Sequence, residues 1–479
     1  MLTQNRQFQW FSEPSYLYPL VPAMAATVLK EAGHDVHWND AIVRGWDFEQ
    51  FFAYFKEQRP DMVIMESKTP VIKKHWRLVK EMKGMMPECK FVLMGDHTTA
   101  KPAESLEHCP VDYVFTGGNY DVTARALCNH LEGEGEMPPG VWYRNDRGEI
   151  VHTGDFELNF DLNELPFHDR DLTVANRYFE KWKKYDGFYY TMVGRDCPYA
   201  KCTFCSWTVT HPRFKTRRPE LLLDEIGYLI EEHGAQEIFD DTGTFPAGSW
   251  LKKFCDGMID RGYHKKVLVT CNMRFDYIKN PEIPVMMKKA GFRKIKSGIE
   301  SANQRSMDIL AKGISLQDVV TGCKNASKAG LEVHLTTMVG YHWESREEAQ
   351  NTINFAKDLM KKGYAEMLQA TVVVPYVGTG LYYHGLEHDA FRFDPFDYDR
   401  YDMTEPAFKT PDMTPEEVMA MANSLYKNFL DPRFVARKLL SIRSWNDVSY
   451  VARGAKAVIG HLKDFSGVRS HADASQSLT

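Results

Sequence analysis

Hydrophobic and polar positions in the first part of the chain alternate between two periods. Segments 21–32, 47–58 and 73–86 repeat apolar residues at helical spacing, and the first ends at Gly33. Between and after them lie short apolar runs typical of buried strands: HDVHWNDA (34–41), DMVIMES (61–67), KFVLMGD (90–96) and VDYVFTGG (111–118). This rhythm predicts a parallel sheet with helices on both faces, a doubly wound, Rossmann-like α/β domain over residues 1–135.

The carboxyl ends of these predicted strands carry small and polar residues. They are Asp40, ESKTP (66–70), GDHTT (95–99) and GGNYD (117–121). Ligands of such sheets bind beyond the carboxyl ends of the strands, so these segments are candidates for a binding edge. Their composition is equally consistent with ordinary strand-to-helix turns.

A second alternation begins near residue 190. Strand-like runs at 188–194, 236–243, 266–276, 294–301, 331–340 and 366–376 are separated by helical segments. About six such units in a row predict a partial (β/α)6 TIM-like barrel over residues 190–385, with its chemistry at the C-terminal mouth.

Two further regions complete the predicted organisation. Residues 136–189, rich in Gly, Pro and Asp, form a connector with a hairpin turn at 145–148. Residues 386–479 begin with an aromatic, acidic linker and continue as a small helical region. Thr414 and Glu417 form a capping box there, and the tail after Gly467 is expected to be disordered.

Composition narrows the class of protein. The 479 residues are 43% hydrophobic and 26% charged, which is ordinary for a globular chain, and the net charge of −6 gives no reason to expect nucleic acid as a partner. Nine cysteines, an odd number, do not suggest a secreted disulfide framework. With no signal-peptide layout and no apolar run near the roughly 20 residues of a membrane span, we expect a cytoplasmic protein.

Three of the cysteines form the one cluster in the sequence. Cys197, Cys202 and Cys205 lie in GRDCPYAKCTFCSW, on the loop after the strand-like run 188–194. Soft thiolates favour zinc or iron–sulfur. A structural zinc site needs a fourth ligand, for which His211 is the nearest candidate, whereas an iron–sulfur cluster with three cysteines keeps one iron open. The spacing favours iron–sulfur and leaves zinc and a chance grouping as alternatives.

This loop and several ordered motifs resemble the radical SAM superfamily. FDDTG (239–243), CNMRFD (271–276), GIES (298–301), AKG (311–313), VGYHWES (339–345) and PYVGTGLY (375–382) follow in the family's order. Segment 18–36, ESKTP, MGDHTT and VDYVFTGG resemble the N-terminal cobalamin (B12)-binding-like domain of one branch. The resemblance covers roughly residues 15–440. It implies a [4Fe–4S] cluster on Cys197, Cys202 and Cys205, S-adenosylmethionine (SAM) on the unique iron, and a cobalamin site.

The resemblance also assigns candidate binding residues. For SAM they are Phe204, Asp240, Asp241, Thr242, Arg274, Gly298, Glu300, Ser301 and Gly340. For cobalamin they are Thr69, His97, Thr98, Gly117 and Gly118. Each type has a plain alternative: the acids can cap a helix, Arg274 can form a structural ion pair, the glycines can ease packing, and His97 can be hydrogen-bonded rather than bound to cobalt.

Two features depart from the family pattern. The usual Cys–x3–Cys–x2–Cys spacing has one extra residue between Cys197 and Cys202, which we expect the loop to absorb as a bulge. Only MLTQN precedes Arg6, so the first strand of the cobalamin-binding-like domain is expected to be short.

The implied activity is reductive cleavage of SAM to a 5′-deoxyadenosyl radical, which removes hydrogen from an unactivated carbon. Cobalamin-dependent methylation of a small-molecule or lipid-like substrate is the first interpretation. Cyclisation, ring contraction or carbon–carbon coupling without cobalamin is the alternative, and a zinc-binding or iron–sulfur/cobalamin carrier module without radical chemistry is a more remote one. The implied partner is a one-electron reductant such as flavodoxin or ferredoxin. A basic C-terminal segment, 433–463, also suggests peripheral membrane contact.

Overall fold

The N-terminal lobe is built on a five-stranded sheet. The computed structural model describes residues 16–464, and the side chains as far as residue 460. Strands β1 (Met62–Glu66), β2 (Lys90–Met94) and β3 (Tyr113–Phe115) are parallel, and β4 (Val141–Arg144) and β5 (Ile150–His152) continue the sheet antiparallel in the order β1-β2-β3-β4-β5. The predicted hairpin turn is present, with Gly148 N donating to Asn145 O at 2.9 Å. Because β4 pairs with β3, this hairpin extends the N-terminal sheet.

The prediction of a strand at 34–41 was wrong. Residues 34–40 form no strand, and Asp40 instead caps α2 (Ala41–Arg44) by accepting from Ile42 N at 3.1 Å. Trp38 Nε1 donates to Tyr178 Oη at 3.2 Å, and that hydroxyl donates to Asp40 at 3.0 Å. The side chains of this segment therefore bind the connector. The predicted short first strand falls within residues 1–15, outside the described residues.

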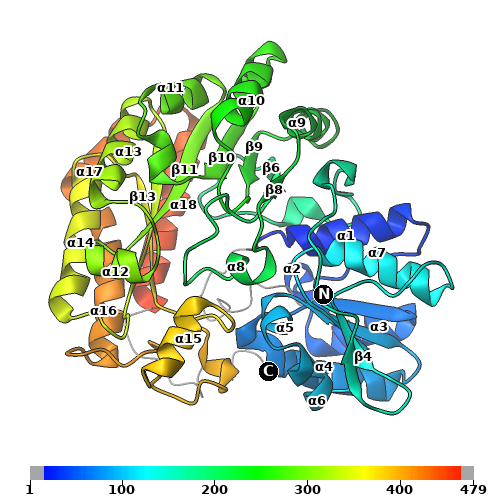
Figure 1. Cartoon of the computed structure of the whole chain (residues 1–479). Helices are drawn as coiled ribbons and strands as arrows, with labels where there is room; N and C mark the ends of the chain where they lie inside the picture. Colours follow the sequence, from blue (N-terminus) through cyan, green and yellow to red (C-terminus); the bar gives the residue numbers. More distant parts are fainter. Residues whose placement is uncertain (1–15, 465–479) are drawn as a thin grey trace.

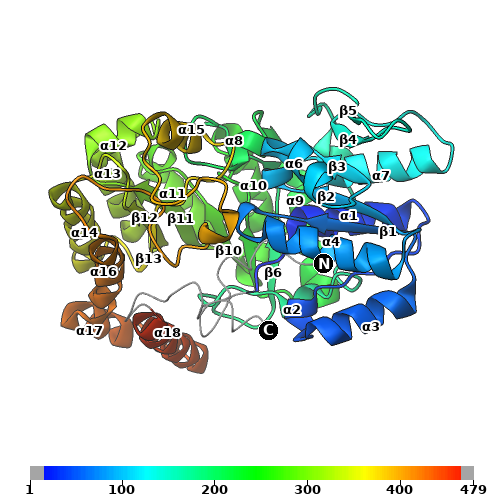
Figure 2. The same ribbon diagram turned by 90° about the horizontal axis from the view of Figure 1, so that it is seen from below.

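Helices cover both faces of the N-terminal sheet. The helices are α1 (Leu20–Glu31), α3 (Phe48–Gln58), α4 (Ile72–Met85), α5 (Asp96–Ala100), α6 (Pro102–His108) and α7 (Tyr120–Leu131). Helices α1 and α7 pack side by side, on the side opposite α3 and α4 (Figures 1 and 2). The buried interiors of β2 and β3 supply the centre of this core, as a doubly wound domain requires.

The second lobe is the predicted six-stranded partial barrel. Its parallel strands follow chain order: β6 (Phe188–Thr191), β9 (Glu237–Asp240), β10 (Leu268–Asn272), β11 (Phe292–Glu300), β12 (Glu332–Val339) and β13 (Met367–Val372). The intervening helices include α9 (Pro219–His233), α10 (Gly248–Asp260), α11 (Glu282–Lys289), α12 (Gln304–Ile309), α13 (Leu316–Lys328) and α14 (Arg346–Lys361). In the described residues β6 and β13 are the two edges and do not pair with each other.

C-terminal helices cover one of these open edges. Helix α15 (Gly380–Glu387) leads through an irregular segment to α16 (Pro415–Tyr426), α17 (Pro432–Leu440) and α18 (Trp445–Asp464). Thr414 and Glu417 form the predicted capping box of α16. Tyr426 Oη, at the end of that helix, accepts from Ala370 N at 3.0 Å and donates to Ala370 O at 2.9 Å on β13. The predicted disordered tail lies outside the described residues.

The two lobes lie side by side and share a polar junction. In both views the N-terminal lobe (blue to cyan) lies beside the barrel (green to yellow), and Figure 1 shows α8 (Trp207–Thr210) between them. Arg195, buried next to the cysteine loop, donates to Asn119 at 2.7 Å and binds Asp121 through both of its terminal nitrogens. No helix among the described residues is long and apolar enough to cross a membrane.

Candidate cofactor site at the barrel mouth

The cysteine loop begins where β6 ends, at the carboxyl edge of the barrel. Cys197, Cys202 and Cys205 are half-buried and carry no disulfide. They are electrostatic neighbours, because Cys197 influences the pKa of Cys202 and Cys202 that of Cys205. Burial raises the pKa of Cys205 to about 12, which means that a bound metal must supply the charge that keeps its thiolate.

The backbone of the cysteine loop is locally distorted. Asp196 (φ 70°) and Ala200 (φ 46°) both adopt the left-handed region, which non-glycine residues rarely enter. Gly243 follows the end of β9, and a Cβ there would lie 3.1 Å from the carbonyl carbon of Asp196. The turn after β9 therefore packs directly on the distorted loop.

The second half of the loop is fixed by two other elements. Thr203 N donates to Leu310 O at 3.0 Å, at the end of α12, and Thr203 O accepts from Leu381 N at 2.8 Å, in α15. Tyr199 Oη donates to Ala311 O at 2.8 Å. Backbone contacts on both sides hold the three cysteines in one place before any cofactor is bound.

A buried cation lies beside the cysteines. Lys312 Nζ donates to Glu300 Oε1 at 2.9 Å and lies 5.5 Å from the centre of the Phe204 ring. Burial would lower the pKa of Lys312, but Glu300 and Cys202 outweigh it and raise that pKa. Lys312 therefore stays charged and offsets negative charge at the cluster position. The sequence analysis quoted its motif but did not single it out.

The geometry argues against the zinc alternative. A structural zinc site at this loop would need His211 as its fourth ligand, beside the three cysteines. His211 turns toward Gly118 of the N-terminal lobe, where a Cβ would lie 1.9 Å from its ring. With His211 held against the N-terminal lobe, three cysteine ligands remain, the number that leaves one iron of a [4Fe–4S] cluster open.

Two of the predicted SAM-binding residues at the end of β9 form hydrogen bonds with other groups of the protein. Buried Asp240 accepts from Thr191 Oγ1 at 2.8 Å and Val193 N at 3.0 Å, and Thr242 Oγ1 accepts from Gly194 N at 2.9 Å. Burial raises the pKa of Asp240 to about 6, against the effect of these hydrogen bonds. Both residues shape the start of the cysteine loop, and direct contact with SAM stays a prediction.

Asp241 has a different environment. Its carboxylate accepts from Asn272 at 3.2 Å and influences the pKa values of Glu180 and Tyr190. Burial raises the pKa of Glu180 to about 7, partly offset by Lys296 of β11. These side chains come from different elements and converge on the inside of the barrel. Groups with displaced pKa values that converge in this way are typical of functional sites.

The other predicted SAM residues are divided between the mouth and the packing around it. Arg274 stacks 3.9 Å from the centre of the Tyr199 ring and pairs with Asp276 at 3.0 Å, so the structural ion pair exists. Gly298 leaves room for the Glu300 side chain, since a Cβ would lie 1.8 Å from its Oε1.

Ser301 and Gly340 serve neighbouring elements. Buried Ser301 Oγ accepts from Asn303 N at 3.2 Å. Gly340 has φ 95° and a Cβ would lie 2.8 Å from Val418 of α16. Contact of either residue with the adenosyl group stays a prediction.

The predicted cobalamin residues all lie at the carboxyl edge of β1–β3. Thr69 Oγ1 lies 3.1 Å from His97 Nδ1, and Glu104 lies 3.4 Å from His97 Nε2. Nδ1 thus has Thr69 as its neighbour, whereas Nε2 makes no well-aligned hydrogen bond with Glu104, and contact of His97 with cobalamin stays a prediction. Thr98 donates to backbone carbonyls, among them Phe115 O at 3.2 Å. Gly117 and Gly118 are approached closely by Phe156 and His211 respectively.

Three buried polar groups at the junction lack satisfactory partners. Neither carboxylate oxygen of Asp196 accepts a well-aligned hydrogen bond, although the side chain is fully buried. Burial raises the pKa of Asp196 to about 7, and the adjacent N–H of Cys197 opposes this only in part. His211 Nε2 and Glu66 Oε2 are likewise buried without a hydrogen-bond partner. Buried polar groups are normally satisfied, so these three fit a polar ligand between the lobes. Sequence spacing carried no signal for them beyond the proximity of Asp196 to Cys197.

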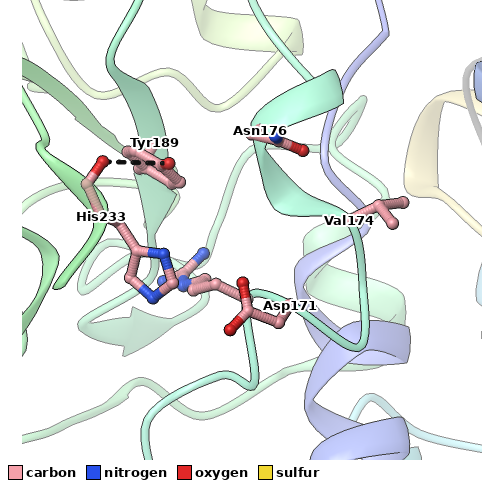
Figure 3. A pocket seen from close by; sticks show the side chains of 6 residues that line it. Asp171, Val174, Asn176, Tyr189 and His233 are labelled. Atoms are coloured by element: carbon pink, nitrogen blue, oxygen red, sulfur yellow. Dashed lines mark hydrogen bonds between the residues drawn. The ribbon is translucent and has the colours of Figure 1, made fainter.

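A surface pocket of about 220 Å³ lies elsewhere. Figure 3 shows Asp171, Val174 and Asn176 of the connector around the pocket, with Tyr189 and His233 on another side; Arg170 also lines it. Tyr189 Oη donates to His233 O at 3.3 Å, at the C-terminal end of α9. The C-terminal end of α9 leads into the start of β9, so the pocket lies at the amino ends of the barrel strands. The cysteine loop follows β6 at the opposite, carboxyl ends.

Comparisons with known proteins agree with this geometry. Residues 191–356 match the Radical SAM superfamily, and residues 14–125 match the B12 binding domain family. Residues 191–356 are therefore a radical SAM domain. The chain also carries the B12-binding domain of the branch that its sequence resembles. The first match spans β6 to α14 and includes all three cysteines, and the second contains β1, β2 and β3.

Relatives match this chain over most of its length. The chain is 26% identical over 430 residues to an uncharacterized methyltransferase of Pyrococcus horikoshii, covering 88% of this chain and 90% of that one. It is 25% identical over 465 residues to the anaerobic magnesium-protoporphyrin IX monomethyl ester cyclase of Cereibacter sphaeroides, covering 93% and 71%.

Among solved structures, the radical SAM methyltransferase TsrM of Kitasatospora setae, with cobalamin and a [4Fe–4S] cluster bound, superposes with a TM-score of 0.69 at 13% identity, covering 93% and 97%. The cobalamin-dependent radical SAM enzyme OxsB, with aqua-cobalamin and SAM bound, superposes with a TM-score of 0.68 at 14% identity, covering 92% and 69%. At such identities the likeness establishes the fold. The predicted fold class and the assignment to radical SAM enzymes are confirmed.

Proposed function

We propose that this radical SAM enzyme uses cobalamin to methylate an unactivated carbon of a small-molecule or lipid-like substrate. The observation that carries the proposal is the position of Asp196. Its buried, poorly satisfied carboxylate lies between Arg195, which binds the B12-binding lobe, and Cys197 of the cluster loop. One site that joins the two cofactors is the arrangement that such a reaction needs.

Each part of the site has a distinct task in this account. Cys197, Cys202 and Cys205 hold the [4Fe–4S] cluster, and Lys312 offsets its charge. When bound, the cofactors supply one-electron cleavage of SAM and a methyl group. Asp196 and His211 accept hydrogen bonds from cofactor groups at the junction.

The inside of the barrel supplies the substrate contacts. Asp241 and Glu180 line one side and Lys296 faces them, so hydroxyl or charged substrate groups would be oriented by charge-assisted hydrogen bonds. The aromatic side chains of Tyr190 and Trp182, both buried, limit the access of water. Cyclisation is the competing outcome, because relatives of the chain include cyclases; the identity of the product distinguishes the two.

Anaerobic reconstitution tests the proposal. The full chain would be loaded with iron, sulfide and hydroxocobalamin, desalted, and assayed for iron and corrinoid. We expect both cofactors in the unaltered chain, loss of iron in Cys202→Ala, and loss of corrinoid with retained iron in Asp196→Asn. Glu164→Gln, an exposed acid of the connector, is the matched control. Iron without any retained corrinoid in the unaltered chain would remove the cobalamin part of the proposal.

The predicted membrane contact is supported by exposed side chains of the C-terminal helices. Leu439, Leu440 and Trp445 of α17 and α18 are 57%, 73% and 86% exposed, beside Arg443. Exposed aromatic and aliphatic side chains next to arginine are typical of an interfacial surface. Other basic residues of this region bind the barrel instead: Lys438 pairs with Glu366 at 2.6 Å and Arg453 donates to Lys183 O at 3.0 Å.

Vesicle sedimentation tests the membrane contact. Vesicles of phosphatidylcholine and phosphatidylglycerol should co-sediment the chain, and Leu440→Ser with Trp445→Ser should abolish this. Phe396→Ser, an exposed aromatic outside α17 and α18, serves as the control. Equal sedimentation of both variants would contradict the assignment. For electron supply, we propose flavodoxin or ferredoxin as the one-electron donor.

A further inference from the structure

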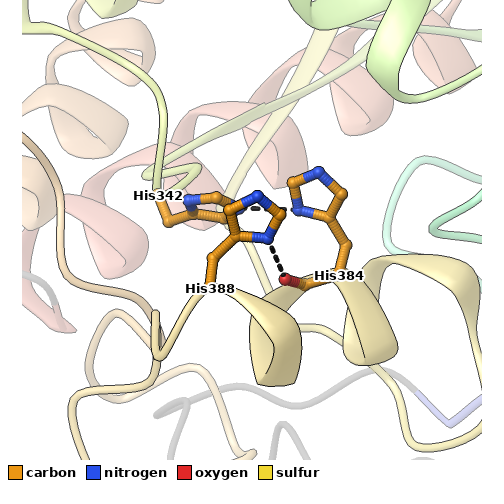
Figure 4. A group of neighbouring side chains, drawn as sticks. All are labelled: His342, His384 and His388. Atoms are coloured by element: carbon orange, nitrogen blue, oxygen red, sulfur yellow. Dashed lines mark hydrogen bonds between the residues drawn. The ribbon is translucent and has the colours of Figure 1, made fainter.

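Three histidines outside the cofactor site lie together on the rim of the barrel. His342 follows β12, and His384 and His388 lie one helical turn apart at the end of α15. One nitrogen of each lies within 4.8 Å of the others. Figure 4 shows the three rings turned toward one another from the loop and the helix.

The contacts of the group are those of preformed ligands. His342 Nε2 and His384 Nδ1 lie 2.8 Å apart, while the rings of His384 and His388 stack with centroids 4.2 Å apart. His388 Nδ1 lies 2.8 Å from His384 O, which fixes the tautomer with a proton on Nδ1 and leaves Nε2 as a lone-pair donor. Ligand histidines are commonly oriented by such a bond from the other nitrogen to a backbone carbonyl.

We infer that His342, His384 and His388 form a binding site for a divalent first-row transition metal ion, separate from the cysteine cluster. Imidazole nitrogens suit zinc, nickel and copper, and at neutral pH most imidazoles are in the neutral form that binds metal. Tetrahedral Zn²⁺ with Zn–N bonds near 2.05 Å needs nitrogens roughly 3.3 Å apart. The two facing nitrogens would move apart by about half an ångström, and more distant pairs, up to 4.8 Å apart, would close by at most about 1.5 Å, which side-chain rotation provides.

The inference does not depend on the proposed function, and it carries a structural consequence. A metal here joins the loop after β12 to α15, and α15 contacts the cysteine loop through Leu381 and Thr203. Three protein ligands leave a further position for water. His384 is partly exposed and His388 is exposed, so the ion can enter from solvent.

Zinc stoichiometry tests the inference in the cluster-loaded chain, whose cysteines are then unavailable to zinc. The holoprotein would be stripped with chelator, exposed to Zn²⁺, desalted and assayed for zinc and iron. We expect about one equivalent of zinc in the unaltered chain and in His130→Gln, a histidine of α7, and none in the double variant His384→Gln, His388→Gln with iron unchanged. Absence of zinc from the unaltered chain, or retention by the double variant, would overturn the inference.

A second measurement does not rely on a variant that folds. Zinc-edge X-ray absorption of the unaltered holoprotein should show three imidazole nitrogens and no sulfur in the first coordination sphere. Sulfur ligands would assign the ion to cysteine and contradict the site. Because neither readout involves SAM or cobalamin, failure of the methylation proposal would leave both interpretable.

Discussion

At the scale of single residues, Asp196 illustrates how a functional group can destabilise the cofactor-free protein. The carboxyl group is buried, and its pKa is raised to about 7. In the unfolded chain it would titrate near 3.9. Because the folded state holds the proton more tightly, stability falls as pH rises from about 4 to about 7 and is constant above that range. The residue is therefore expected to serve a ligand rather than the fold.

Asp196→Asn should stabilise the cofactor-free chain at pH 8 by about 2 kcal/mol, a value reduced from the full shift to allow for local relaxation. The gain should shrink as pH falls toward 4, where the carboxyl group is neutral in both states. Urea unfolding at both pH values measures the difference. A variant that is less stable than the unaltered chain at pH 8 would show that the carboxylate has a structural partner.

Lys312 makes the opposite contribution. It is buried and neutralises Glu300, so Lys312→Met leaves a buried carboxylate unpaired and should cost about 3 kcal/mol of stability. Removing the cation beside Cys202 should also reduce iron incorporation. Lys312→Met combined with Glu300→Gln removes both charges and should recover most of the stability, but not the iron content. Recovery of both would limit Lys312 to a structural role.

The sequence predicts the chemistry of the site better than its individual contacts. The spacing of Cys197, Cys202 and Cys205 carries its meaning locally, and the structure keeps these residues together. Asp240, Ser301 and Gly340 instead bind or pack against neighbouring elements. Their partners come from other segments of the chain, and residue spacing in the sequence does not reveal such partners. The sequence does not single out Asp196 and Lys312 either, because only their burial in the fold distinguishes them from ordinary charged residues.

At the scale of elements, the open edges of the barrel need cover. An unpaired edge strand exposes backbone groups, and Tyr426 satisfies both free groups of Ala370 on β13. The periodicity predicted every barrel strand, since each short strand-like run stands between segments of helical spacing. It failed at residues 34–41, where apolar Trp38 and polar Asp40 contact the connector and not a neighbouring strand.

Tyr426→Phe should therefore destabilise the chain by about 2 kcal/mol, since a buried N–H and C=O lose their partner while packing is kept. The denaturation midpoint in urea reports the change. Tyr383→Phe removes the hydroxyl of an exposed tyrosine and should have no effect. Equal stability of the two variants would mean that other groups satisfy the backbone N–H and C=O of Ala370 on β13.

At the scale of the whole molecule, the buried Arg195–Asp121 pair couples the two lobes. Asp121→Asn leaves the guanidinium without its counter-charge and should cost about 3 kcal/mol, chiefly by loosening the junction. We expect corrinoid content to fall more than iron content after reconstitution, because the cluster loop stays within the barrel. Parallel loss of both would show that the pair is needed for folding of the barrel itself.

Cleavage of SAM by a cluster on Cys197, Cys202 and Cys205 underlies every function proposed for this protein. Chromatography of the products formed after anaerobic reduction of the reconstituted chain with SAM tests for this cleavage. We expect 5′-deoxyadenosine from the unaltered chain and from His130→Gln, and none from Cys202→Ala. Product from Cys202→Ala, or an unaltered chain that assembles the cluster and leaves SAM intact, would show that these cysteines do not hold a SAM-cleaving cluster.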